Sequence, residues 1–287
     1  MSKHNCQLNI AGVNLKISTP FLCEVGERCK PFISISEAED LRLEYQIGLP
    51  NYQGEKLVKD RSPRIWEGED YYRVERSFIQ PLEPITAFFI PKRNLDQAEG
   101  YIRPGYEERF IEMTKLLNIS ELETLMAGRG IVSLHSSLVR YQDSAILFTA
   151  PSGTGKTTQA ELWEKHRGAE QLNGDRSFIR KKGKGWFAYG SPFAGNSGIY
   201  RNEFAPIRAI VVLRQAQENA IKHISKSEAF RCLYSETVIP LWNDSAHTQI
   251  VDILTAIVSE LPVFMFFSTP DERAVNRLDR YLLEEGI

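Results

Sequence analysis

Residues 145–158 read Ala-Ile-Leu-Phe-Thr-Ala-Pro-Ser-Gly-Thr-Gly-Lys-Thr-Thr, and they carry the strongest structural signal in the chain. It begins with a short apolar run whose length suits a buried strand. A glycine-rich turn follows, and after it the residues 159–165 predict a helix. A strand, a glycine-rich turn and a helix in this order are typical of a mixed α/β domain that contains a phosphate-binding loop, or P-loop.

The glycine-rich turn has the chemistry needed to hold the phosphates of a nucleotide. Small residues let successive backbone N–H groups face an anion, and the following helix adds its positive dipole end. Lys156 is expected to reach the β- and γ-phosphates, and the Thr157 hydroxyl to coordinate Mg²⁺. The sequence therefore predicts ATP and Mg²⁺ as cofactors, bound by Ser152, Gly153, Thr154, Gly155, Lys156, Thr157 and Thr158.

One position departs from the usual phosphate-loop pattern, because Ala150 stands where the first glycine is expected. An alanine is tolerated there if its φ is negative, since only a positive φ demands glycine. The alternative interpretation is a glycine-rich turn without a ligand. It is the weaker one, because the strand, the loop, the Lys-Thr pair and the helix all occur in the required order.

The first aspartate after the loop is Asp175, in the sequence Asn173-Gly174-Asp175. A carboxylate beside the γ-phosphate can bind Mg²⁺ or take the proton of an acceptor hydroxyl. The same tripeptide is also ordinary turn chemistry, so the residues alone leave both interpretations open.

The chain divides into three parts by its apolar patterning. Residues 1–105 read as a β-rich accessory domain, with a hairpin at 8–17 and further strands at 41–47, 72–78 and 85–90. Residues 106–130 read as a helical connector in which Ser120 and Glu123 fit a capping box. Residues 131–287 form the P-loop domain.

Further elements are predicted within residues 131–287. Strands are expected at 132–139, 209–213 and 263–267, and two more on either side of the Gly183-Lys184-Gly185 turn. Helices are expected at 227–238 and 247–261, and a last helix is expected to be capped by Thr269. Arg180, Lys181, Lys182 and Lys184 are interpreted as a solvated hairpin tip.

Composition excludes several classes of protein. The 287 residues carry a formal net charge of -2, which argues against a protein built mainly to hold nucleic acid. Four irregularly spaced cysteines do not suit a disulfide framework or a zinc site made of four thiolates. The most apolar stretch, 263–267, is far shorter than a membrane-spanning helix, and no signal-peptide run follows the first residues. We therefore expect a cytoplasmic protein without membrane or nucleic-acid partners.

The chain resembles the HPr kinase/phosphorylase-like kinases. More closely, it resembles a branch associated with ribosomally made modified peptides, which includes lasso-peptide kinases. The resemblance covers about residues 130–280 and lies in Leu134–Ser137, Ala150–Thr158, Leu172–Arg176, Tyr189–Gly195 and Ala209–Leu213. It implies a core like that of ATP-dependent phosphoenolpyruvate carboxykinase, and phosphoryl transfer from ATP to a hydroxyl, typically of a serine.

The resemblance also implies roles for site residues. HPr kinases carry two adjacent acidic residues after the phosphate loop, and here Gly174 replaces the first of them. Asp175 would then serve both as base and as Mg²⁺ ligand, or another carboxylate such as Glu203 would complete the set. His135, at the family's Leu-His-Ser position, is expected to contact the γ-phosphate or the acceptor; a histidine satisfied between strands is the alternative. The expected catalytic residues are Asp175, His135 and Lys156.

The segment Ser191–Ser197 is rich in small residues and is interpreted as a loop that approaches a phosphate or acceptor, with Ser197 as a donor. Arg201 is a weaker candidate for neutralising phosphate charge.

The leading hypothesis is a kinase whose acceptor is a serine of a peptide or protein, or a small alcohol. The alternative is a nucleotide-binding regulatory protein. Carboxykinase chemistry on a keto acid lacks a supporting His and Lys set. Acceptor recognition is expected in the N-terminal domain, and the sequence does not indicate an oligomeric state.

Overall fold

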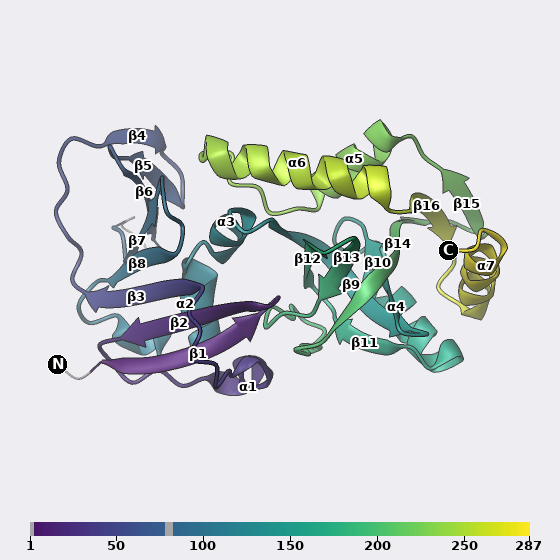
Figure 1. Ribbon diagram of the computed structural model, residues 1–287, viewed down its shortest axis with the longest axis horizontal. Helices are drawn as coiled ribbons and strands as arrows, with labels where there is room; N and C mark the ends of the chain where they lie inside the picture. Colours follow the sequence, from purple (N-terminus) through teal and green to yellow (C-terminus); the bar gives the residue numbers. More distant parts are fainter. Residues whose placement is uncertain (1–2, 78–82) are drawn as a thin grey trace. The chain divides into compact units, whose positions relative to one another are not determined.

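The computed structural model describes residues 3–77 and 83–287, which form two compact units (Figure 1). The first unit runs to Arg129 and also takes in residues 240–247, and the second comprises residues 130–239 and 248–287. The helical connector expected at 106–130 therefore groups with the first unit up to Arg129. Residues 240–247, expected in the P-loop domain, also group with the first unit.

The first unit is built on an eight-stranded sheet with the order β1-β2-β3-β8-β7-β6-β5-β4. Its strands pair antiparallel except for β2 with β3 and β3 with β8. Phe78, part of one predicted strand, lies outside the described residues. The elements are β1 (His4–Ile10), β2 (Val13–Thr19), α1 (Gly26–Cys29), η1 (Lys30–Phe32), β3 (Leu41–Ile47), β4 (Lys56–Lys59), β5 (Arg64–Glu67), β6 (Tyr71–Arg76), β7 (Thr86–Pro91), β8 (Gln97–Ile102), η2 (Glu107–Phe110), α2 (Met113–Ile119) and α3 (Leu122–Ala127).

One face of this sheet forms the core of the first unit. The Tyr45 hydroxyl on β3 donates to the carbonyl of Leu116 in α2, at 2.8 Å. A Cβ atom at Gly100 would collide with the rings of Tyr45 and Phe88, so glycine is needed for this close packing. The opposite face of β6, β7 and β8 carries polar and aromatic side chains.

The predicted capping box at Ser120 and Glu123 is wrong. Ser120 is fully buried, and its hydroxyl donates to the carbonyl of Leu117 at the end of α2. The N-cap of α3 is Glu121, with a left-handed φ of 51° and no side-chain cap bond. The connector is therefore a 3-10 turn and two short helices. The hydroxyl of Ser120 bonds to a carbonyl at the end of α2 and is not available to cap the N-terminus of α3.

The second unit contains a mixed sheet whose pairings close a ring, β10–β9–β12–β13–β14–β10. The long strands β9 and β14 each take part in two sections of the sheet. The elements are β9 (Ile131–Tyr141), β10 (Ser144–Thr149), α4 (Lys156–Arg167), β11 (Glu170–Asn173), β12 (Arg176–Lys182), β13 (Gly185–Tyr189), β14 (Phe204–Gln215), β15 (Ala220–His223), α5 (Lys226–Ser235), α6 (Asp244–Glu260), β16 (Val263–Ser268) and α7 (Glu272–Glu284).

The core of the second unit fixes the strand that leads into the glycine-rich loop. Ile146 and Phe148 of β10 are fully buried and belong to one apolar cluster with Trp163 of α4 and Phe266 of β16. Parallel pairing of β10 with β14 continues this buried layer. The mixed α/β class predicted from the sequence is thereby confirmed. None of the described helices is long and apolar enough to span a membrane.

The last helix begins two residues later than the predicted cap. Asp271 is the N-cap of α7, and its carboxylate accepts from the backbone N–H of Arg273 at 3.0 Å. Thr269, the predicted cap, instead donates through its hydroxyl to Asp271 and receives a bond from the Asn219 amide. The tether to Asn219 keeps Thr269 outside the helix.

Candidate functional site: a cleft at the glycine-rich loop

The loop between β10 and α4 uses glycine where its backbone demands it. Positive φ occurs in this loop at Gly153 (80°) and Gly155 (107°), and not at Ala150. The alanine at the first position of the pattern is therefore compatible with the loop conformation. Gly155 is the N-cap of α4, so the unpaired N–H groups of the first helical turn begin directly after it.

Lys156 is the first residue of α4 and is buried. Its ammonium donates to the carbonyl of Ala150 at 2.7 Å and to that of Pro151 at 3.4 Å. Burial lowers the pKa of Lys156 below its usual 10.5, although the carboxylates of Glu236 and Asp175 partly oppose this shift. Within the described residues the hydrogen bonds of this buried cation go to carbonyl groups, so a bound anion would supply a full countercharge.

The register of β9 brings His135 and Asp175 together. His135 pairs with Arg176 of β12, and its neighbour Ser136 pairs with Thr149 at the end of β10. The backbone N–H of Ser136 donates to the carbonyl of Asp175, at 2.9 Å. As a result, Nε2 of His135 lies 3.5 Å from Oδ1 of Asp175, beside the start of the glycine-rich loop.

Glu236, which the sequence analysis missed, completes a chain of three side chains. Its Oε2 lies 3.2 Å from Nδ1 of His135, on the side of the ring opposite to Asp175. The Glu236 side chain is only 11% exposed. Its backbone carbonyl also accepts from the N–H of His135, at 2.8 Å. His135 therefore lies between two carboxylates, with Nδ1 facing Glu236 and Nε2 facing Asp175.

Gly174, which replaces the first acid of the HPr kinase pair, lies against the loop 191–198. A Cβ atom at this position would overlap the hydroxyl of Ser197. That hydroxyl donates to the carbonyl of Ala194 at 2.7 Å, so Ser197 does not act as the free donor expected from the sequence. Gly195, with φ of 52°, packs against Asp175: a Cβ there would lie 2.9 Å from its Cγ. The loop 191–198 therefore packs directly against Asp175, the one acid of the pair that this chain retains.

Hydrogen bonds from the side chain of Asn173 hold the loop 191–198 in place. The fully buried amide of Asn173 donates to the carbonyls of Ser191 and Phe193, at 3.0 and 3.2 Å. The amide oxygen of Asn173 accepts from the backbone N–H of Asp175, at 2.9 Å. These bonds fix where Asp175 stands relative to the loop 191–198.

These residues enclose a cleft of about 310 Å³. The structure brings Ser152, Gly153, Gly155, Lys156, Thr157, Thr158, His135 and Asp175 together around it, joined by Gly174, Asn196 and Ser197. Thr154, also predicted for this site, lines a neighbouring cleft on the other side of the loop.

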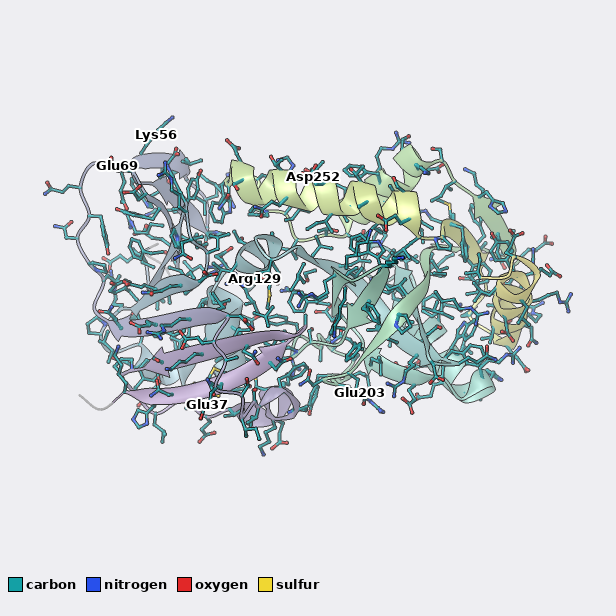
Figure 2. All side chains as sticks on the ribbon, viewed as in Figure 1. Glu37, Lys56, Glu69, Arg129, Glu203 and Asp252 are labelled. Carbon is teal, nitrogen blue, oxygen red and sulfur yellow. The ribbon has the colours of Figure 1, made fainter. Side chains whose placement is uncertain are left out.

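Two further residues considered from the sequence do not line this cleft. Glu203, labelled in Figure 2, is ion-paired with Arg140 at 2.6 Å and lies 3.8 Å from Arg201. Both Glu203 and Arg201 are therefore engaged outside the cleft. Of the two alternatives for the acidic set, this placement favours Asp175 alone over Asp175 with Glu203.

The donor set fits a magnesium ion bound together with nucleotide phosphates. Thr157 supplies a hydroxyl and Asp175 a carboxylate, both within the same cleft. Among the described residues no group of three His, Cys, Asp or Glu side chains forms a metal cage. Magnesium commonly needs only one or two carboxylates when phosphates supply further ligands, so this arrangement suffices.

Comparison with known proteins gives little beyond this geometry. No protein-family model matches the sequence, and no curated protein is similar to it in sequence. Among solved structures, the HPr(Ser) kinase/phosphatase from Coxiella burnetii aligns with 10% identity and a TM-score of 0.30, over 54% of this chain and 93% of that one.

Proposed function

We propose that the second unit is a kinase which binds ATP with Mg²⁺ and transfers the γ-phosphoryl group to a hydroxyl. The observation that carries this proposal is the placement of Asp175 and His135 in the same cleft as Lys156 and the N-terminus of α4. One side of the cleft suits phosphates, since it offers backbone N–H groups and a buried cation. The other side offers a base.

The residues suggest how transfer would proceed. The acceptor oxygen attacks the γ-phosphorus, the bond between that phosphorus and the β,γ-bridging oxygen breaks, and the hydroxyl proton passes to Asp175, leaving ADP and a phosphate ester. Lys156 and the amides of the loop would neutralise the charge on the transferred group. Bound Mg²⁺, held by Thr157 and Asp175, would supply further charge neutralisation. His135, held between Glu236 and Asp175, would keep the Asp175 carboxylate in place beside the acceptor.

A second cleft supports binding of a whole nucleotide. This cleft, of about 360 Å³, shares Gly153, Gly155 and Thr158 with the first and extends to Gln159, Gln215 and Thr269. The buried amide of Gln159 donates to the carbonyl of Thr269, at 3.1 Å, and so fixes one wall of this cleft. The cleft would take the ribose and base of the nucleotide. The phosphates would then pass along the loop from one cleft to the other.

The acceptor proposed from the family resemblance is a serine of a peptide or protein, with a small alcohol as the alternative. A nucleotide-binding regulatory protein remains the competing function, because only one acid of the HPr kinase pair is present. The contact between Glu236 and His135 favours the kinase. A protein that only binds a nucleotide has no need of a histidine oriented towards an acid.

The test is transfer of label from γ-phosphate-labelled ATP in an extract of the cells that produce the protein. Label on a polypeptide or small molecule is expected with the wild type, and its loss with Lys156→Ala and with Asp175→Asn. Asp252→Asn is a matched control, because Asp252 is an exposed carboxylate on α6 (Figure 2). Transfer that survives Asp175→Asn would contradict the proposal, and ATP binding without transfer to any fraction would favour the regulatory protein.

A further inference from the structure

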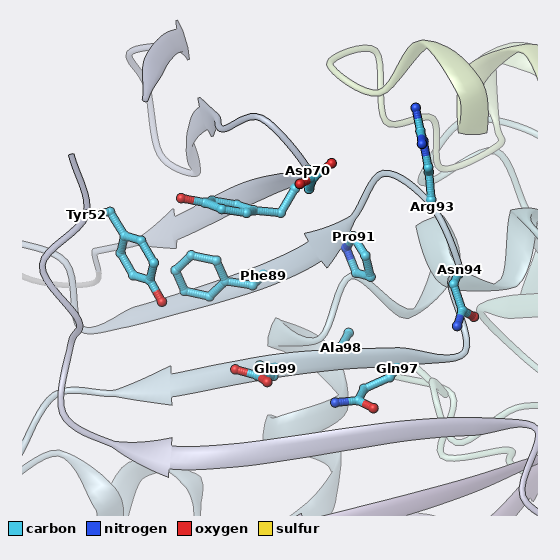
Figure 3. A pocket seen from close by; sticks show the side chains of 10 residues that line it. Tyr52, Asp70, Phe89, Pro91, Arg93, Asn94, Gln97, Ala98 and Glu99 are labelled. Atoms are coloured by element: carbon cyan, nitrogen blue, oxygen red, sulfur yellow. The ribbon is translucent and has the colours of Figure 1, made fainter. Parts of the chain in front are cut away.

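The first unit contains a trough of about 440 Å³ on the open face of its sheet (Figure 3). Phe89 of β7 faces Arg73 of β6 on one side and Glu99 of β8 on the other. Directly paired residues share a face, so these three strands present one row of side chains. In Figure 3, Phe89 and Pro91 form the floor, Asp70 stands on one side, and Glu99 with Gln97 on the other.

Aromatic rings gather at one end of this trough. The ring of Tyr52 lies 4.5 Å from that of Phe89, and the Tyr71 ring lies 5.2 Å from Phe89 and 5.8 Å from Tyr52, measured between centroids. Tyr101 adds a fourth ring, 5.3 Å from Phe89. Phe89 is only 8% exposed beneath these rings, so the half-buried rings of Tyr52 and Tyr71 are the ones that offer their faces to a ligand.

The charges around the trough leave a negative excess. Asp70 and Glu99 line it, and Arg93 is the one cation among the described residues that line it. The Tyr101 hydroxyl donates to the Glu99 carboxylate at 2.7 Å. Because this hydroxyl is neutral, the bond does not balance the negative charge of Glu99. Beneath the rings, Arg73 is ion-paired with both Glu55 and Glu75, so this group also sums to a negative charge.

Arg73 shows how this surface accommodates a cation. Its guanidinium lies 5.7 Å from the ring centroid of Tyr52 and 5.0 Å from that of Trp66, while carboxylates neutralise it. The trough offers the same combination of rings and carboxylates to a group arriving from outside. A phosphate or a carboxylate ligand would meet repulsion there.

We propose that this trough binds the side chain of a lysine or arginine in an extended segment of a polypeptide. The cation would lie against Tyr52 and Tyr71, within reach of Glu99. Asn94 and Gln97 line the other end of the trough and offer amide groups that match the main chain of such a segment. This inference goes beyond the proposed kinase function and does not depend on it, since every lining residue belongs to the first unit.

The test is calorimetric titration of the full chain with the pentapeptide acetyl-Ala-Ala-Lys-Ala-Ala-amide. Counterparts carrying Arg or Gln at the central position are titrated in the same way. The Lys and Arg peptides are expected to bind at least about fivefold more tightly than the Gln peptide, because only they carry the cation. Higher salt is expected to reduce this preference.

Substitutions of the carboxylates that line the trough test whether the peptides bind there. Glu99→Gln and, separately, the exposed Asp70→Asn are expected to reduce the preference for Lys over Gln, whereas Glu69→Gln is expected to leave it unchanged. Glu69 is an exposed carboxylate next to Asp70 that does not line the trough. Equal binding of the Lys and Gln peptides would overturn the proposal. So would no binding of any peptide up to about 10 mM, or a preference that survives in folded Glu99→Gln and Asp70→Asn proteins.

Discussion

At the scale of single residues, the imidazole of His135 joins two carboxylates that come from distant parts of the chain. Glu236 and His135 are separated by 101 positions, and their contact arises because the segment after α5 pairs with β9. Glu236 would act as a positioning residue, since it bonds to Nδ1 and leaves Nε2 directed at Asp175.

Replacing Glu236 by alanine is expected to lower kcat for phosphoryl transfer roughly 10- to 100-fold, because the imidazole loses its orientation. The affinity for ATP is expected to stay within about twofold, since Glu236 does not line the phosphate cleft. Glu236→Gln retains an acceptor for Nδ1–H and should recover part of the rate with an altered pH profile. Glu218→Ala, in an exposed turn, serves as control. Equal losses for both glutamate substitutions in kcat and ATP affinity would indicate a purely structural role.

Position 174 yields a second prediction. Gly174→Ala is expected to destabilise the fold by about 1–3 kcal/mol, because the new methyl group would overlap the Ser197 hydroxyl. The double variant Gly174→Ala with Ser197→Gly is expected to regain much of this loss. Urea denaturation measures both. A stable single variant would mean that the loop 191–198 moves aside freely, and that an acid at position 174 could be accommodated.

The sequence could name some of these residues and not others, for physical reasons. Lys156 and Thr157 follow from a local motif in which loop and helix are adjacent in sequence. Asp175 follows from its distance after that motif and from the family resemblance. Glu236 belongs to no motif, and only the pairing of its segment with β9 brings it to the site.

At the scale of elements, the glycine-rich loop and α4 act together. The loop places the ammonium of Lys156 in a buried position, where desolvation lowers its pKa from 10.5. Bound phosphates favour the charged form of this lysine. Nucleotide binding is therefore linked to its protonation.

The linkage gives a pH dependence with a definite sign. As pH rises towards 10.5, Lys156 loses its proton earlier than an ordinary lysine, so affinity for ATP is expected to fall within that alkaline range. In Lys156→Arg the cation persists, and the fall should be absent or smaller. Binding of ATP measured from neutral to alkaline pH in both proteins tests this. Identical profiles would show that another group controls the dependence.

Apolar periodicity predicted several elements well, including the hairpin of β1 and β2 and the strands β14 and β16. Helix ends were predicted less well. Ser120 and Thr269 both have the chemistry of a cap, but burial directs Ser120 to the carbonyl of Leu117, and Asn219 holds Thr269. Such tertiary partners cannot be seen in a local pattern.

At the scale of the whole molecule, the chain forms two units with separate tasks in the proposed account. The parallel pairs β2–β3 and β3–β8 in the first unit, and the grouping of residues 240–247 with it, join segments far apart in sequence. No local sequence pattern predicts such pairings. The phosphate cleft lies wholly in the second unit, and the aromatic trough wholly in the first.

The central claim is that the cleft between β10 and α4 holds the phosphates of ATP. It is tested most directly by calorimetric titration of the full chain with ATP and Mg²⁺, comparing wild type, Lys156→Ala and Lys165→Ala. Lys165 is an exposed lysine of the same helix. Lys156→Ala is expected to weaken binding about 10- to 100-fold, since a charged hydrogen bond is lost, while Lys165→Ala binds as the wild type does. Equal affinities of Lys156→Ala and wild type, or no binding of ATP by the wild type, would contradict the claim.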